Sequence, residues 1–139
     1  PAPWRESSIA VEAAMDSEAT PRRGVMVVMT DVSPECEDSF NRWYDTEHVP
    51  ERVALPGVRR ARRYVRYESS PQPADGTVTA VRGPKYLVVY EFDDIEVLHG
   101  AWAELGEDPS AESRRMYPEM SNVVREAFVE IGAFEEEGP

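Results

Sequence analysis

Two nearly continuous apolar runs constrain how this chain can fold. The first covers residues 24–32 and ends at Ser33-Pro34, and the second covers residues 85–92. Each has the length of a strand rather than that of a helix, and each is rich in the β-branched residue valine. Apolar side chains on both faces of the pleat are typical of a strand that is covered from two sides. We therefore expect two central strands of a sheet that needs cover on both faces.

The segments around these runs complete a β-α-β-β-α-β order. Turn residues and helical spacing predict, in chain order, a helix over residues 33–48, a strand over 58–68, a helix over 93–105, a short helix over 109–116 and a strand over 121–134. This order is that of the split ferredoxin-like motif, an α+β fold with a four-stranded antiparallel sheet. Helices cover only one face of such a sheet, so we predict a homodimer in which a second copy covers the other face.

Length and turn composition indicate a single domain. The chain of 139 residues has the size of one domain, which we place at residues 24–134. Residues 1–23 are interpreted as a partly ordered N-terminal arm, and residues 135–139 as an acidic tail. Residues 69–83 are rich in proline and glycine and are interpreted as a long connection, with a short strand pairing at 77–81 as an option.

Composition excludes several classes of function. The formal charge of −12 argues against nucleic-acid binding, because phosphate backbones are bound by an excess of Lys and Arg. No apolar run approaches the roughly 20 residues needed to span a bilayer, and the first residues lack the pattern of a secretory signal, so we expect a cytoplasmic protein without a membrane segment. One cysteine and two histidines exclude a disulfide framework and disfavour a zinc site. We expect neither a metal nor a cofactor.

The first expected helix carries the strongest functional signal. Phe40, Tyr44 and His48 follow one another at four-residue intervals, with Trp43 and Glu47 alongside, so all five share one face. A histidine among carboxylates and aromatic rings is typical of an acid/base site for a small molecule. A histidine at the end of a helix can instead satisfy backbone carbonyls and favour the negative end of the helix dipole. Both interpretations stay open at this point.

The residues around this histidine also form a motif. Aromatic residues, a glutamate, the histidine and a proline end the helix, and an aliphatic-Pro-Gly turn leads into the next strand. In this segment the chain resembles the EthD-like branch of the dimeric α/β-barrel superfamily, and in element order the resemblance covers residues 24–134. The residues that carry it are Trp43, Tyr44, Glu47, His48, Pro50, Arg52, Pro56 and Gly57.

This resemblance implies a dimeric α/β barrel with a pocket for a small molecule in each subunit. The superfamily includes cofactor-free monooxygenases, muconolactone-type isomerases, polyketide cyclases, aldoxime dehydratases with haem, and members with no assigned chemistry. The resemblance therefore leaves the reaction open. The arm at residues 1–23 and the connection at residues 69–83 set this chain apart from the shorter members of the superfamily.

The residues and the resemblance together predict a set of catalytic residues. His48 is the expected general acid/base, with a pKa near the working pH, and Asp45 or Glu47 is expected to orient its ring. Tyr44 is expected to donate a hydrogen bond to the reacting oxygen. Trp43 is expected to shape the cavity and bind the substrate, although packing in the core would explain this residue equally well.

Three further residues are expected to bind the substrate. Tyr64 and Tyr90, each on a predicted strand, supply phenols to the site if their side chains face the helices. Arg115, shortly before Pro118, is expected to clamp a carboxylate or an enolate, with a role in capping the last strand as the alternative. His99 is expected to be an exposed histidine rather than a haem ligand.

These expectations combine into one main hypothesis of function and two alternatives. The main hypothesis is a cofactor-independent lyase, isomerase or cyclase that acts on an aromatic or polyketide-like molecule through His48. The first alternative is a non-catalytic ligand-binding or accessory protein of a degradative or biosynthetic pathway, which needs the same cavity but no titrating histidine. The second alternative is a cofactor-free monooxygenase.

Overall fold

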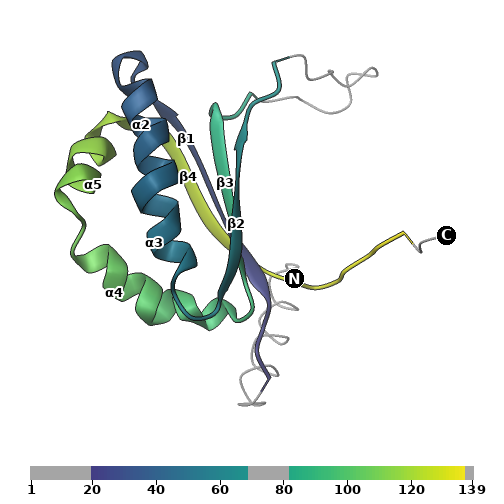
Figure 1. Ribbon diagram of the computed structural model, residues 1–139. Coiled ribbons are helices and arrows are strands. Elements are labelled where there is room, and N and C mark those ends of the chain that lie inside the picture. Colours follow the sequence, from purple (N-terminus) through teal and green to yellow (C-terminus); the bar gives the residue numbers. More distant parts are fainter. Residues whose placement is uncertain (1–19, 69–81, 137–139) are drawn as a thin grey trace, which may run out of the picture.

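A four-stranded antiparallel sheet organises the computed structural model, which describes residues 20–68 and 82–136. The strands are β1 (Gly24–Val32), β2 (Val58–Val65), β3 (Tyr86–Phe92) and β4 (Met120–Val129). They lie in the order β2-β3-β1-β4, and each neighbouring pair is antiparallel. Helices connect β1 to β2 and β3 to β4 (Figure 1). This is the predicted ferredoxin-like α+β fold.

The two apolar runs form the central strands, as predicted, whereas the outer strands are shorter than expected. β2 ends at Val65, and β4 ends at Val129. β4 ends there because Val129 pairs with Gly24, the first residue of β1. One more backbone hydrogen bond follows, from the N–H of Glu130 to the carbonyl of Arg23 at 2.8 Å, and residues 131–136 then continue without a strand partner in the described part of the chain. The pairing considered at residues 77–81 and most of the N-terminal arm lie outside the described residues.

One long helix crosses the sheet between β1 and β2. It comprises η1 (Pro34–Cys36), α2 (Glu37–Trp43), the π-helical segment η2 (Tyr44–His48) and α3 (Val49–Val53). The prediction that this helix ends near His48 is wrong, because the chain stays helical through Pro50. In η2 the N–H of Val49 donates to the carbonyl of Tyr44, five residues back. A π turn is wider than an α turn, so it has room for the ring of Pro50, which has no N–H to donate to the helix.

Shorter helices connect β3 to β4. They are η3 (Ile95–His99), α4 (Ala101–Glu107), α5 (Ala111–Met116) and η4 (Tyr117–Glu119). The single helix expected over residues 93–105 is divided at Gly100 into a 3₁₀ and an α segment. The short helix expected next is α5, which Ser110 caps by accepting a hydrogen bond from the N–H of Ser113 at 3.1 Å. None of the helices in the described ranges is long and apolar enough to cross a membrane.

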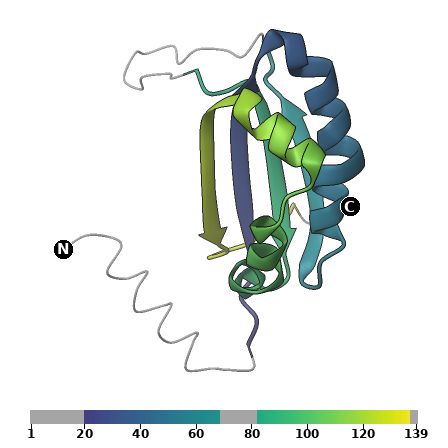
Figure 2. The same ribbon diagram turned by 90° about the vertical axis from the view of Figure 1, so that its left-hand side faces the viewer.

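The hydrophobic core lies between the helices and one face of the sheet. Figures 1 and 2 show the helices on the same side of the sheet, with the long helix over its β2–β3 half. Phe40 of α2 is fully buried, and its ring centre lies 4.8 Å from that of Tyr44 and 5.4 Å from that of Tyr86 on β3. Phe40 thus joins the long helix to the sheet. The other buried apolar residues are Met26, Trp43, Tyr44, Val88, Tyr90, Phe92, Ile95, Trp102 and Met116.

The opposite face of the sheet, here called the bare face, carries apolar side chains with no helix over them in the described part of the chain (Figure 1). Val25 and Val27 of β1 alternate along the strand with Met26, which is buried in the core. Val89 of β3 pairs with Val27, and Phe128 of β4 pairs with Val25 and is 49% exposed. A soluble monomer rarely leaves such a face uncovered.

Candidate functional site

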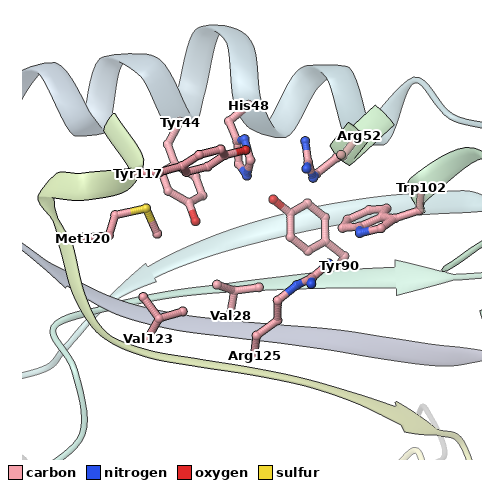
Figure 3. A pocket seen from close by; sticks show the side chains of 11 residues that line it. Val28, Tyr44, His48, Arg52, Tyr90, Trp102, Tyr117, Met120, Val123 and Arg125 are labelled. Carbon is pink, nitrogen blue, oxygen red and sulfur yellow. The ribbon is translucent and has the colours of Figure 1, made fainter. Parts of the chain in front are cut away.

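A cavity of about 360 Å³ lies between the long helix and the sheet (Figure 3). This volume falls within the roughly 300–1,000 Å³ that is typical of small-molecule sites. The side chains around it are mainly aromatic, apolar or basic. The lining residues are Val28, Tyr44, His48, Arg52, Tyr90, Trp102, Gly106, Tyr117, Met120, Val123 and Arg125.

The cavity has a buried interior and an open edge at β4. Tyr44, Tyr90 and Trp102 are each at most 4% exposed, whereas Val123 and Arg125 of β4 are exposed. Figure 2 shows β4 at the edge of the sheet farthest from the long helix. A ligand would therefore enter beside β4.

The long helix brings three polar side chains to the cavity. Tyr44, His48 and Arg52 follow one another at four-residue intervals, and all three are buried. Figure 3 shows them extending from the helix toward the sheet. Because the helix continues past Pro50, Arg52 lies one turn beyond His48 on the same face.

The imidazole of His48 is surrounded by aromatic rings. Its centre lies 4.4 Å from the ring of Trp43, 4.9 Å from that of Tyr44 and 6.1 Å from that of Tyr117. The residue is 8% exposed, and its Nδ1 atom is buried without a hydrogen-bond partner among the described residues. This ring nitrogen is therefore a buried polar atom whose hydrogen-bonding capacity the described residues leave unused.

The electrostatic surroundings of His48 favour its uncharged form. Its pKa is lowered from 6.5 to about 3, chiefly because burial disfavours the imidazolium and secondarily because Arg52 and Arg125 lie nearby. The expectation of a pKa near the working pH is therefore wrong. At neutral pH the imidazole is uncharged, so it can accept a proton as a base but does not serve as an imidazolium acid.

Hydrogen-bond donors face the same cavity. Burial raises the pKa of Tyr44 to about 12 and also raises the pKa of Tyr90, so both phenols are protonated at neutral pH. The Tyr90 hydroxyl and Trp102 Nε1 are buried without a hydrogen-bond partner in the described ranges. Because a phenol can donate and an indole N–H can only donate, the cavity suits a ligand with oxygen acceptors.

The two carboxylates expected to orient His48 have other partners. Asp45 is exposed and accepts a hydrogen bond from Nη1 of Arg63 at 2.7 Å, which joins the helix to β2. Glu47 accepts a hydrogen bond from Oγ of Ser110 at 2.9 Å, which joins the helix to α5. Neither carboxylate forms a hydrogen bond with the imidazole in the described structure, so their visible role is to connect elements.

Trp43 packs beside His48 without lining the cavity. The residue is 2% exposed, and its Nε1 donates a hydrogen bond to Oγ of Ser113 at 3.1 Å. It therefore joins α5 to the long helix and supports the imidazole through ring contact. This position agrees with the core-packing interpretation of Trp43.

Among the predicted substrate-binding residues, the structure brings Tyr90 to the cavity and leaves the others outside it. Tyr64 is 48% exposed and lies on the bare face of the sheet, so its side chain does not face the helices. Arg115 is exposed and pairs with Glu112, one turn earlier in α5. His99 is exposed, as expected.

Sequence reasoning missed the two arginines of the cavity as ligand-binding residues. The signal for Arg52 was its spacing of four residues from His48, which the expected helix end at Pro50 obscured. Arg125 pairs with Val28 in the register of β4 and β1. Its inward position follows only from that register.

Neither a metal cluster nor a relative identifies this site. Among the described residues, no group of three or more His, Cys, Asp or Glu side chains is arranged to hold a metal ion. Comparisons of the chain with protein-family models, with curated proteins and with solved structures gave no significant match. The resemblance to the EthD-like branch therefore rests on the motif at residues 43–57 and on the order of the elements.

Proposed function

We propose that this protein is a cofactor-independent enzyme of the lyase, isomerase or cyclase type, related to the EthD-like branch, in which His48 acts as a general base. One observation carries the proposal: an imidazole that burial keeps uncharged lies in a cavity with protonated phenols around it. The aromatic walls suit a flat, aromatic or polyketide-like molecule.

The expected step is removal of a proton from a carbon next to a carbonyl group. The C–H bond breaks, the proton moves to the unprotonated ring nitrogen of His48, and the electron pair moves to the neighbouring oxygen as an enolate or phenolate. Tyr44 and Tyr90 line the same cavity and can stabilise that oxygen through their hydroxyl groups. Return of the proton to another atom, loss of a leaving group or attack on a second carbonyl would give an isomerase, a lyase or a cyclase.

A non-catalytic ligand-binding protein is the second candidate, and one observation favours it. Catalytic bases are commonly oriented by a third group, but no carboxylate of the described residues forms a hydrogen bond with His48. In that case the cavity would bind the molecule and release it chemically unchanged.

Elimination of 5-nitrobenzisoxazole tests the proposal without knowledge of the natural substrate. A base removes one ring proton, the N–O bond breaks, and a coloured cyanophenolate forms. We expect a saturable rate above that of free imidazole at equal concentration, constant between about pH 6 and 8 because His48 is already uncharged there. A rate no greater than that of free imidazole would contradict the proposal and favour the ligand-binding protein.

We also propose that a second copy of the chain covers the bare face. The strand registers place Arg62, Val89, Val27 and Glu126 in one row across the sheet, from edge strand β2 to edge strand β4. Rotation about a two-fold axis parallel to the strands lays β2 of one protomer over β4 of its partner. Arg62 then faces Glu126 of the partner subunit, and Val89 faces the partner's Val27, so charged and apolar side chains both match.

The mass in solution tests the homodimer. Light scattering at micromolar concentration is expected to report twice 15.7 kDa. Arg62→Glu or Glu126→Arg alone sets like charges against each other and is expected to weaken the dimer by about tenfold or more, whereas the double variant restores it. A monomer at micromolar concentration, or a double variant no more dimeric than either single variant, would rule out this arrangement.

A further inference from the structure

Among the described residues, the side chains that line the cavity at His48 include two guanidinium groups and no carboxylate. Of the 139 residues of the chain, 27 are Asp or Glu, yet none of them lines this cavity in the described structure, whereas Arg52 and Arg125 do. A site with this charge in an acidic protein favours an anionic ligand.

Both arginines differ from most surface arginines of the molecule in having no acidic partner. Arg63 pairs with Asp45 at 2.7 Å, and Arg114 pairs with Asp108 at 3.1 Å. In contrast, neither Arg52 nor Arg125 forms an ion pair with a carboxylate of the described residues. Their charges are therefore available to a ligand.

The burial of Arg52 is stronger evidence for an anionic ligand than the missing ion pairs of the two arginines. The residue is 8% exposed, and its guanidinium lies over the ring of Trp102, 5.1 Å from the ring centre. Removing a positive charge from water without a neighbouring negative charge is costly, and the cation–π contact offsets only part of that cost. A negatively charged group in the cavity would supply the missing partner.

The remaining polar atoms of the cavity need acceptors as well. Trp102 Nε1 can only donate, and so can the guanidinium groups of both arginines. The hydroxyl of Tyr90 is also buried without a partner among the described residues. An oxyanion offers several lone pairs and can satisfy more than one of these donors at once.

The two charges lie at different depths. Arg52 comes from the helix side and is buried, whereas Arg125 comes from β4 and is exposed at the open edge (Figure 3). An anion would therefore meet Arg125 on entry and Arg52 inside the cavity. No lysine lines the cavity, and the planar fork of a guanidinium matches the two oxygens of a carboxylate.

We propose that the molecule bound beside His48 is a small organic carboxylate, whose carboxylate group is held by Arg52 and attracted by Arg125. This inference rests on the proposed function, because it takes the His48 cavity as the substrate site. A cavity of about 360 Å³ has room for one or two rings beside the carboxylate.

Calorimetric titration with three probes of similar shape tests the inference. Benzoate carries the carboxylate, benzamide is its neutral counterpart, and phenyl phosphate carries a different anion. Benzoate is expected to bind at least about tenfold more tightly than benzamide. Arg52→Gln and Arg125→Gln are each expected to reduce this preference severalfold, whereas Arg42→Gln, an exposed arginine on the same helix that does not line the cavity, leaves it unchanged.

The possible results separate this inference from the proposed function. Equal binding of benzoate and benzamide, or tighter binding of phenyl phosphate than of benzoate, would overturn the carboxylate assignment. Arg125 is exposed, so Arg125→Gln still tests the assignment if Arg52→Gln unfolds the protein. A benzoate preference that is unchanged in both variants would also overturn the carboxylate assignment. If the protein eliminates nitrobenzisoxazole but does not prefer benzoate, the role of His48 as a base is supported and only the carboxylate inference is contradicted. If the protein prefers benzoate but does not eliminate nitrobenzisoxazole, the carboxylate inference is supported and only the proposed catalysis is contradicted.

Discussion

Replacing His48 by alanine is expected to slow the elimination of 5-nitrobenzisoxazole by about 10²–10⁴-fold, because the variant lacks the base that accepts the proton. Phenol donors and the two arginines stay in the cavity, so the probe should still bind. Initial rates measured at saturating probe would show the loss in kcat. Added imidazole is expected to restore part of the rate, because the space left by the side chain can admit it.

The other histidine provides a matched control. His99 is exposed on η3 and does not line the cavity, so His99→Ala should keep the wild-type rate. A His48→Ala variant that is folded and as fast as the wild type would show that His48 is not the base. Equal losses in both variants would point to a general effect on the protein.

Acidification is expected to destabilise the fold through His48 by about 2 kcal/mol between pH 7 and pH 5. The folded state holds the pKa of this residue at about 3, whereas the unfolded chain has the ordinary value of 6.5. Between these two values the unfolded state binds a proton that the folded state does not, so the free energy of unfolding falls as the pH falls. Well above pH 6.5 neither state is protonated, and this contribution to the pH dependence disappears.

Urea unfolding of the wild type and of His48→Gln at both pH values measures this contribution. The variant lacks the titrating ring and should lose about 2 kcal/mol less than the wild type on acidification. Carboxylates with a lowered pKa, such as Glu37 beside Lys85, are common to both proteins and cancel in the comparison. The same loss in both proteins would mean that His48 titrates normally in the folded state.

Much of the fold could be predicted from local patterns. The apolar runs at residues 24–32 and 85–92 became β1 and β3, because runs of this length that are rich in β-branched valine favour strands over helices. The four-residue spacing of Phe40, Tyr44 and His48 predicted their shared buried face. The end of the long helix was not predictable from Pro50, because a π turn before it changed the local hydrogen bonding.

The candidate site was predictable only in part. Tyr44, His48 and Tyr90 line the cavity as expected, whereas Tyr64 and Arg115 lie elsewhere. Sequence spacing can place side chains on one face of a helix, but the face of a strand that meets that helix depends on register.

The sequence by itself determined the order of the elements, the two central strands and the aromatic face that carries His48. These features depend on the periodicity of side chains along short segments, which is a local property of the chain. Only the tertiary structure decided that Arg52 and Arg125 share the cavity with His48, and that its pKa falls instead of lying near neutrality. Burial and the nearby charges cause that change, and both arise when distant segments pack together.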